Sequence, residues 1–178
     1  MPMNPSASPE LYPITHARFL ADVALLGRRI EADAWMPDIL VGIGRGGLVP
    51  AVYLSHRLNR PMLSIDYSSN LLALADPALA GIAAKSAAGV RCLLIDDIND
   101  SGGTIGQLRR LLRDQGSDLR HVRFAVLLNN DSSGETVDYC ADNIDRKIDK
   151  RWFVFPWEAL AAEEAIVEEA LSLPDRLA

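Results

Sequence analysis

The sequence has few of the residues that staple small domains or bind metals in clusters. It contains only two cysteines, Cys92 and Cys140, and neither has a second cysteine or a histidine at metal-ligand spacing. A disulfide framework and a zinc motif are therefore excluded. We expect both cysteines to be buried free thiols, as suits a reducing cytosol.

Long apolar runs and N-terminal targeting patterns are also missing. The longest stretch of low charge, residues 71–90, is interrupted by Asp76, Pro77 and Lys85 and is too broken to span a bilayer. Residues 1–13 hold four prolines and have neither the basic nor the apolar region of a signal peptide. We therefore expect a cytoplasmic protein that has no membrane partner.

A block of basic residues is the third absence. Eighteen Lys and Arg stand against 24 Asp and Glu, which gives a net charge of −6 over 178 residues. This balance argues against binding to nucleic acid, although it leaves room for a small anion at a site with its own local field. Apolar residues make up 49%, enough for one domain with a core of its own.

What is present is an alternation of apolar runs and amphipathic segments, which predicts an α/β fold with a mainly parallel sheet and helices on both faces. We expect a flexible lead-in over 1–13 and a single domain over 14–178. The apolar runs predict strands at 39–43, 62–67, 90–95, 122–128, 137–140 and 152–155. The helical patterns lie at 15–35, 49–58, 104–115 and 158–173, with Thr15 as the first N-cap and Pro50 in the first turn of the second helix.

Two glycine-rich segments follow predicted strands, where ligands bind in such sheets. The first, Gly42-Ile-Gly-Arg-Gly-Gly47, has dinucleotide-binding spacing, and Asp66 lies where an acid would meet a ribose. A preceding helix, Arg45 inside the segment and a second anion loop all count against a nicotinamide cofactor. A nicotinamide-dependent dehydrogenase and a purely structural tight turn remain alternatives for this segment.

The second segment, Leu93 to Thr104, carries the more specific pattern. Its strand ends in Asp96 and Asp97, whose side chains point to opposite faces of a strand, so that one can bind hydroxyls or Mg²⁺ while the other supports the loop. Ser101-Gly-Gly-Thr104 then opens a helix, where backbone N–H groups, hydroxyls and the helix dipole make a phosphate cradle. A simple capped turn explains poorly why three carboxylates, including Asp100, crowd this point.

This pattern, Asp-Asp-x-x-Asp-Ser-Gly-Gly-Thr after an apolar strand, resembles the signature of type I phosphoribosyltransferases, which use phosphoribosyl pyrophosphate (PRPP). Arg45-Gly-Gly-Leu-Val-Pro-Ala51 resembles the pyrophosphate loop of the bacterial xanthine-guanine enzymes. Asp138-Tyr139 and Trp152 to Trp157 resemble their base-binding hood. The likeness covers roughly residues 14–158.

The resemblance implies a role for each matching residue. It makes Asp100 the general base near purine N7 and gives the ribose hydroxyls to Asp96 and Asp97, directly or through Mg²⁺. The remaining implied contacts to PRPP are made by Arg45 and Gly46, where the family often has a non-proline cis peptide, and by Ser101, Gly102, Gly103 and Thr104. The implied base contacts are Asn129, the stacking ring of Trp152 and the backbone of Phe153.

Three departures from the family concern the base and the flap. Asn129 stands where enzymes for 6-oxopurines place a lysine, and Val154 stands where they place an acid. The implied flap, about 68–88, is unusually apolar, and the implied hood covers about 130–158. By resemblance we expect a homodimer or homotetramer. The sequence thus predicts Mg²⁺-dependent phosphoribosyl transfer to a purine-like nucleobase. A non-catalytic PRPP or nucleotide sensor is the alternative.

Overall fold

The central sheet is parallel and has five strands, in the order β3-β2-β4-β5-β6. The computed structural model describes residues 9–67 and 77–172. The strands of the sheet are β2 (Ile39–Ile43), β3 (Met62–Ile65), β4 (Cys92–Asn99), β5 (Val122–Asn130) and β6 (Tyr139–Ile144). The connecting helices are α1 (His16–Glu31), α2 (Gly44–Leu58), α3 (Pro77–Ala87), α4 (Gly103–Asp114) and the short η1 (Leu119–His121). The predicted α/β class with a parallel sheet is confirmed.

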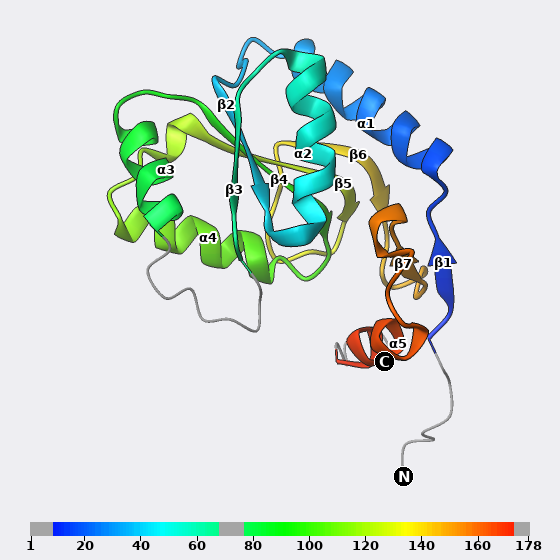
Figure 1. Cartoon of the computed structure of the whole chain (residues 1–178). Helices are drawn as coiled ribbons and strands as arrows, with labels where there is room; N and C mark the ends of the chain where they lie inside the picture. Colours follow the sequence, from blue (N-terminus) through cyan, green and yellow to red (C-terminus); the bar gives the residue numbers. More distant parts are fainter. Residues whose placement is uncertain (1–8, 68–76, 173–178) are drawn as a thin grey trace. The chain divides into compact units, whose positions relative to one another are not determined.

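The chain divides into two compact units, residues 22–144 and residues 1–21 together with 145–178. The first of these, which we call the sheet unit, contains the whole central sheet (Figure 1). None of the helices in the described ranges has both the length and the apolar character that a membrane span requires.

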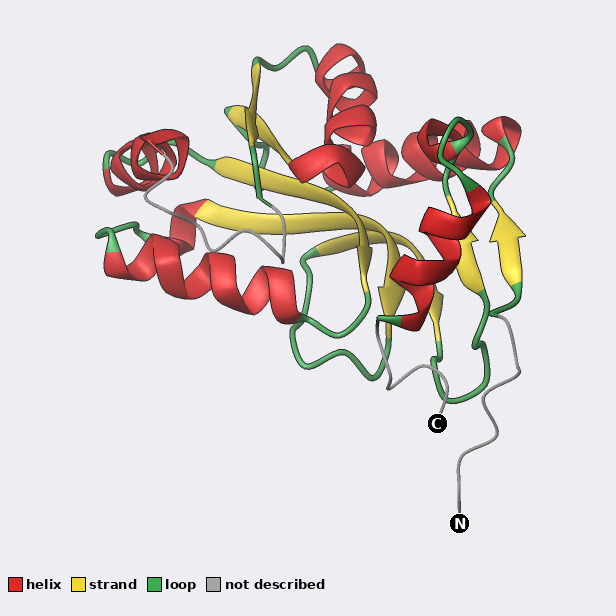
Figure 2. Ribbon diagram, turned by 60° about the horizontal axis from the view of Figure 1, so that its bottom comes forward, coloured by secondary structure: helices red, strands yellow, loops and turns green. Residues whose placement is uncertain are grey.

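The strand order of the sheet unit creates a switch point between β2 and β4. From β2 the chain moves outward through α2 to β3, whereas from β4 it moves the other way through α4 to β5. Because both crossovers are right-handed in such folds, α2 and α4 fall on opposite faces of the sheet, as Figure 2 shows. The N-termini of both helices therefore meet the same crevice at the carboxyl ends of β2 and β4.

A buried core on each face holds these elements in place. The α3–α4 face buries alternate residues of the strands, including Val41, Ile43 and Leu94, against Ile82 and Leu108. On the α2 face the fully buried side chains include Leu54 of α2 and Leu40, Leu93 and Ile95, which alternate along β2 and β4 with the residues of the other face. All five residues of β2 are buried, which explains its continuous apolar run.

Thr15 caps α1 as predicted, because its Oγ1 accepts a hydrogen bond from Arg18 N at 3.1 Å.

The helix α2 begins earlier than the sequence predicts. In α2, helical structure starts at Gly44, so the first glycine segment is the opening turn of a helix and not a loop before it. Pro50 consequently lies in the helix interior, where it has no N–H to donate to the carbonyl four residues earlier.

The second half of the expected flap is part of the core. Residues 77–87 form α3, whose Leu79, Ile82 and Ala83 are buried. The leucine- and alanine-rich composition of this segment therefore reflects packing against the sheet. Residues 68–76, the other part of the expected flap, lie outside the described residues.

The second unit contains a small parallel sheet of two strands, of which the sequence predicts only the second. Its strand β7 (Trp152–Val154) pairs with β1 (Leu11–Pro13), three residues within the expected flexible lead-in. A 3-10 turn, η2 (Pro156–Glu158), and α5 (Glu163–Leu171) follow, so the last helix starts later than residue 158. Phe155 and Trp157 stack at 4.8 Å, and Phe19 packs edge-on against Trp157 at 5.4 Å.

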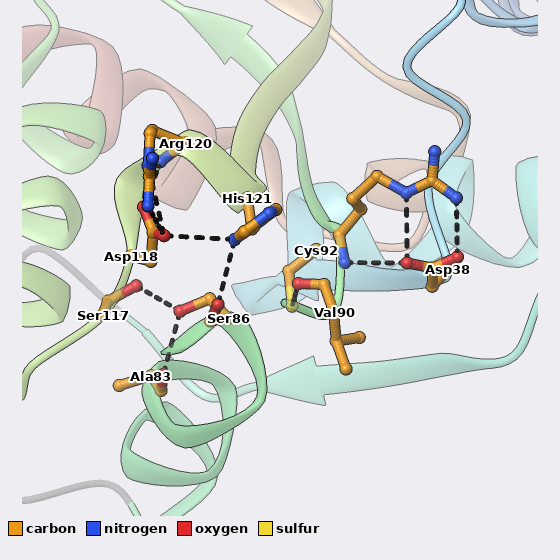
Figure 3. Close-up of polar contacts among 10 residues, drawn as sticks. Asp38, Ala83, Ser86, Val90, Cys92, Ser117, Asp118, Arg120 and His121 are labelled. Carbon is orange, nitrogen blue, oxygen red and sulfur yellow. Dashed lines mark hydrogen bonds and ion pairs between the residues drawn. The ribbon is translucent and has the colours of Figure 1, made fainter. Parts of the chain in front are cut away.

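At the amino ends of the strands, polar groups are paired with one another (Figure 3). Asp38 accepts hydrogen bonds from the backbone N and the guanidinium of Arg91 at 2.9–3.2 Å. Asp118 pairs with Arg120 at 2.7 Å, and His121 Nδ1 lies 3.2 Å from Ser86 O. Both cysteines are free, and burial raises the pKa of Cys92 to about 11, whereas Cys140 is only partly buried.

Candidate active site

Two helix N-termini whose N-cap residues have no capping side chain face the crevice between β2 and β4. Neither the N-cap of α2, Ile43, nor that of α4, Gly102, makes a side-chain capping hydrogen bond. The first-turn N–H groups of a helix have no partner within the helix, and its dipole places partial positive charge there. The crevice therefore offers two anion-binding ends, one from each glycine-rich segment.

Asp96 and Asp97 stand at the end of β4 between these two helices. Strand β4 runs to Asn99, four residues beyond its predicted end, so both acids lie within the strand. A Cβ built on Gly46 would lie 2.3 Å from Asp97 Oδ2, which puts the Asp97 carboxylate against the first turn of α2. Asp96 alternates to the opposite face, as the period of a strand requires.

The Asp96 carboxyl is electrostatically unfavourable as a charged group. Burial and, secondarily, the negative charge of Asp97 raise its pKa well above the usual value, although a hydrogen bond from Asp97 N at 3.0 Å opposes this. A cation or a hydroxyl donor from a ligand would relieve both causes. Acids with perturbed pKa values in a crevice are candidates for a functional site.

The opening turn of α2 packs without space for side chains at two glycines. A Cβ on Gly47 would lie 1.9 Å from Ile95 O, so the helix backbone rests directly on β4. Arg45, two residues before Gly47, is exposed. The peptide bond between Arg45 and Gly46 is trans, unlike the cis bond that the resemblance suggested, as are all peptide bonds in the described residues.

Residues 100–104, which we call the phosphate loop, join β4 to α4. Gly102 has φ 88°, a left-handed conformation that glycine adopts without strain. Ser101 Oγ accepts a hydrogen bond from Gly103 N at 3.2 Å, and Gly102 O accepts one from Gly106 N at 2.9 Å. Thr104 lies in the first turn of α4. The four residues predicted to hold the 5′-phosphate are therefore contiguous at a helix N-terminus.

Asn129 belongs to a ladder of amides across three strand ends. Its Oδ1 accepts from Asn99 Nδ2 at 2.9 Å, and its Nδ2 donates to Asn143 Oδ1 at 3.0 Å. The register aligns these three residues on β4, β5 and β6. Asn99 directly precedes Asp100, so the ladder connects the predicted base-binding residue to the phosphate loop.

Trp152 and Phe153 belong to the second unit. Trp152 N donates to Glu10 O at 2.7 Å, and Val154 O accepts from Ile14 N at 2.8 Å, so both of these residues direct their backbone groups towards β1. The backbone of Phe153, between them, points to the opposite edge of β7, to which no strand pairs among the described residues. That free edge is what a backbone contact to a base requires.

Two residues of the motif that resembles the hood lie at the other end of the sheet. Asp138 and Tyr139 lie at the start of β6, the end of the sheet remote from the crevice, where Asp138 Oδ2 accepts from Phe124 N at 2.8 Å and Tyr139 contacts Arg123. They therefore anchor the amino ends of β5 and β6 to each other. Arg109 of α4 pairs with Glu135 at 2.5 Å.

Sequence reasoning also missed the polar residues that support the phosphate loop. Asn99 is 2% exposed and Asn130 is 6% exposed, so both are buried amides with specific partners. Their positions at strand ends are visible in the sequence, but the parallel register that places Asn99 beside Asn129 is a property of the sheet.

The carboxylates present fit a magnesium ion that is held largely by its substrate. No group of three or more His, Cys, Asp or Glu side chains within 9–67 and 77–172 could enclose a metal. Magnesium usually takes one or two carboxylates and completes its shell with water and substrate phosphates. Asp96, whose pKa is raised by burial and by the charge of Asp97, would supply that small donor set together with Asp97.

Comparison with known proteins finds relatives of the family that the sequence resembles, and the match covers most of the chain. The family described as phosphoribosyl transferase domain matches residues 14–163. The xanthine-guanine phosphoribosyltransferase of Nitratidesulfovibrio vulgaris (strain Hildenborough) is 25% identical over 151 residues, which cover 84% of this chain and 86% of the relative. The predicted likeness to the xanthine-guanine enzymes is thereby confirmed, and the dehydrogenase alternative finds no support.

Two solved structures share the fold. The purine phosphoribosyltransferase from Pyrococcus horikoshii OT3 aligns with TM-score 0.61 and 23% identity, covering 85% of this chain and 96% of its own. The xanthine-guanine-hypoxanthine phosphoribosyltransferase of Helicobacter pylori aligns with TM-score 0.63 and 21% identity, covering 84% and 95%. With a crevice built from two helix N-termini and an acidic strand end, and with a family match over residues 14–163, the chain belongs to the phosphoribosyl transferase domain family.

Proposed function

We propose that this protein transfers a phosphoribosyl group from PRPP to a purine or purine-like base and releases pyrophosphate, in a reaction that uses Mg²⁺. The observation that carries the proposal is the pairing of two anion-binding helix ends on either side of Asp96 and Asp97. PRPP is a sugar with a phosphate at one end and a pyrophosphate at the other, which is the ligand such a pair of ends would span. The matching family and the curated relatives are named as transferases, which favours an enzyme over a sensor.

In this proposal the two phosphate groups bind to different segments. The 5′-phosphate accepts hydrogen bonds from Ser101, Thr104 and the amides of Gly102 and Gly103, whereas the pyrophosphate lies at the first turn of α2, beside Arg45 and Gly46. Fixed amides and a helix dipole stabilise the negative charge that develops on the leaving pyrophosphate. The exposed Arg45 adds a mobile positive charge at this end.

The carboxylates at the strand end would bind the ribose and the metal. Asp96 and Asp97 would accept hydrogen bonds from the two ribose hydroxyls or ligate Mg²⁺. Bound magnesium would supply charge neutralisation at the departing pyrophosphate. Binding would also offset the cost of holding Asp96 charged, since burial and Asp97 raise its pKa in the free protein.

Asp100 would act as the general base for the attacking nucleobase. It is the first residue of the phosphate loop, and its own carbonyl is fixed by a hydrogen bond from Asn130 Nδ2 at 2.9 Å. A carboxylate there can accept a ring proton as the ring nitrogen attacks the ribose carbon. Trp152 would stack on the base, and Phe153 would contribute backbone groups from the free edge of β7.

The base half of the site suggests an unusual preference. Asn129 offers a neutral amide that can both donate and accept, and its amide orientation is set by its neighbours in the ladder. A lysine at this position would only donate, with full charge. We therefore expect weaker discrimination in favour of 6-oxopurines than a lysine would provide.

The test is a titration with PRPP and Mg²⁺, followed by assays of pyrophosphate release with a panel of nucleobases. We expect binding of PRPP and turnover with at least one purine. Asp100→Asn should retain PRPP binding and lose about 100-fold or more in kcat, because general base catalysis contributes on that scale. Asp114→Asn, an exposed acid at the far end of α4, is the matched control and should behave like the wild type.

Absence of PRPP binding at millimolar concentration would overturn the proposal. PRPP binding without turnover on any base would instead favour the sensor. The homodimer or homotetramer expected from the resemblance stays a prediction that sizing of the purified protein can check.

A further inference from the structure

The loop between β5 and β6 is tied to the phosphate loop through its carbonyl groups. We call residues 130–136 of this loop the brace. Asn130 Nδ2 donates to Asp100 O at 2.9 Å, and Gly134 N donates to Ser101 O at 3.1 Å. Two successive carbonyls of the phosphate loop therefore point towards the brace.

The direction of these carbonyls determines the direction of the adjoining amides. The peptide bonds here are trans, so each N–H points opposite to the carbonyl of the same peptide group. Because the carbonyls of Asp100 and Ser101 point to the brace, the N–H groups of Ser101 and Gly102 point away from it. Such successive aligned amides form an anion-binding concavity.

Asn130 is itself held in one orientation. Its Oδ1 accepts hydrogen bonds from Ser132 N at 3.2 Å and Ser132 Oγ at 3.0 Å, so its Nδ2 must face Asp100 O. The side chain is only 6% exposed, and water therefore has little access to replace a lost bond. A buried carbonyl that loses its donor costs about 1–3 kcal/mol unless the peptide turns.

Glu135 fixes the other end of the brace against α4. Its carboxylate pairs with Arg109 Nη1 at 2.5 Å, and Arg109 Nη2 donates to Thr136 O at 2.8 Å. The packing is close, because a Cβ on Gly106 would lie 2.8 Å from Glu135 Oε1 and one on Gly102 would lie 2.7 Å from Glu135 N.

Asn99 joins the brace to the end of β4. Its Nδ2 donates to Glu135 O at 2.7 Å, and its Oδ1 accepts from Ser133 Oγ at 3.0 Å. The same Nδ2 group bonds Asn129, so this buried amide is satisfied by partners on two sides. The residues on either side of the phosphate loop are thus held by one polar network.

We propose that Asn130 and Glu135 are positioning residues for phosphate binding, which hold the N–H groups of Ser101 and Gly102 aimed at the 5′-phosphate of PRPP. This inference rests on the proposed function and adds residues that do not themselves touch the substrate. Preorganised donors need no reorientation when the anion arrives, so loss of the brace should weaken phosphate binding specifically.

The experiment compares three alanine variants of the full-length protein. Asn130→Ala and Glu135→Ala should each raise the dissociation constant and the KM for PRPP roughly tenfold, the equivalent of about 1.4 kcal/mol. The KM for the nucleobase, and kcat at saturating PRPP, should stay within about twofold, since uniform binding is lost and not transition-state binding. Asp131→Ala, an exposed acid in the same brace, is the matched control and should leave every constant unchanged.

A conservative variant separates positioning from general structural damage. Glu135→Gln keeps an oxygen that can accept from Arg109, so it should recover most of the PRPP affinity that Glu135→Ala loses. If Asn130→Ala does not fold, the Glu135 pair still decides the matter, because that side chain is about one-third exposed at its surface.

Unchanged PRPP affinity in both brace variants would overturn this proposal while leaving the transferase intact. Equal losses in kcat, the base KM and the PRPP KM would also overturn it, because a loosened fold predicts that pattern. Failure of the wild type to bind PRPP would overturn the transferase and the brace together.

Discussion

The two ends of the central sheet treat their acidic residues in opposite ways. At the amino ends, Asp38 is hydrogen-bonded to Arg91, and this pairing lowers the pKa of the Asp38 carboxyl. At the carboxyl ends, burial and a neighbouring acid raise the pKa of Asp96. The same sheet thus carries compensated charges at one end and an uncompensated charge at the other.

This difference separates residues that stabilise the fold from residues that are kept for a ligand. Paired groups at the amino ends contribute to folding and leave nothing for a substrate to satisfy. The carboxyl end retains a costly acid and two helix N-termini, and in the proposed function these would gain partners from a phosphorylated sugar and a metal.

The largest predicted effect on stability comes from adding one methyl group at Gly47, where α2 packs on β4 at the carboxyl end of the sheet. In Gly47→Ala the new Cβ would lie 1.9 Å from Ile95 O, a backbone atom that cannot move aside. We expect a loss of about 3 kcal/mol or more, well above the gain of about 1 kcal/mol that alanine brings to a helix. Thermal and denaturant unfolding measure this effect.

The matched control is Gly81→Ala in α3, where a Cβ would meet nothing within 4 Å. That variant should be more stable than the wild type by about 0.5–1 kcal/mol. Equal stability of the two variants would contradict the close packing of α2 on β4.

A second and smaller effect distinguishes the phosphate loop from an ordinary helix end. Gly102 and Gly116 stand before and after α4 with φ 88° and 82°, so alanine at either position should cost about 1–2 kcal/mol of stability. Only Gly102→Ala also meets the brace, at Glu135 N, and only that variant should bind PRPP more weakly. Calorimetric titration of both variants with PRPP checks this, and a similar loss in Gly116→Ala would refute a specific role for the loop.

A third prediction concerns the neutral ladder at the base half of the carboxyl end. Asn129→Lys replaces a two-way amide by a charged donor, which should raise the preference for hypoxanthine over adenine roughly tenfold in kcat/KM. The change also removes the acceptor of Asn99 Nδ2, so some stability should be lost. Asn143→Lys puts the same charge one strand further from Asp100 and should change the preference less.

The smallest predicted effect concerns how stability depends on pH, which should differ in sign between Asp38 at the amino ends of the strands and Asp96 at their carboxyl ends. Because the folded pKa of Asp38 lies below its unfolded value, the stability it contributes is present above about pH 4 and is lost as pH falls through the folded pKa. Asp38→Asn should therefore be less stable than the wild type at neutral pH, with the difference fading in acid.

The sign reverses for Asp96, whose folded pKa is raised. Its ionisation in the folded protein costs stability, and this cost grows as pH rises above about 4. Asp96→Asn should be more stable than the wild type at neutral pH in magnesium-free buffer. Denaturant titrations of both variants and the wild type across pH 3–8 test these two predictions. If the stability difference from the wild type changed with pH in the same direction for both variants, the contrast between Asp38 and Asp96 would be contradicted.

Much of the fold and the phosphate half of the site could be predicted from the sequence because their signals are local. Four apolar runs marked β2, β3, β4 and β5, and the contiguous Asp96 to Thr104 pattern indicated a strand end, a phosphate cradle and a helix start. The place of Asp138 at the amino end of the sheet could not be predicted, since the motif says nothing about which end of β6 it occupies. The predicted loop at Gly44 was wrong, because close packing on Ile95 favours a helix despite three glycines.

By itself, the sequence determined the class of fold, the family resemblance and the residues of the phosphate loop. All three depend on periodicity or on neighbours along the chain. The tertiary structure decided which residues support that loop, because Asn99, Asn129 and Asn143 meet only through the parallel register of three strands, and Glu135 reaches α4 only through the turn after β5. Such contacts join residues remote in sequence, and their geometry depends on how the strands align and not on any local preference.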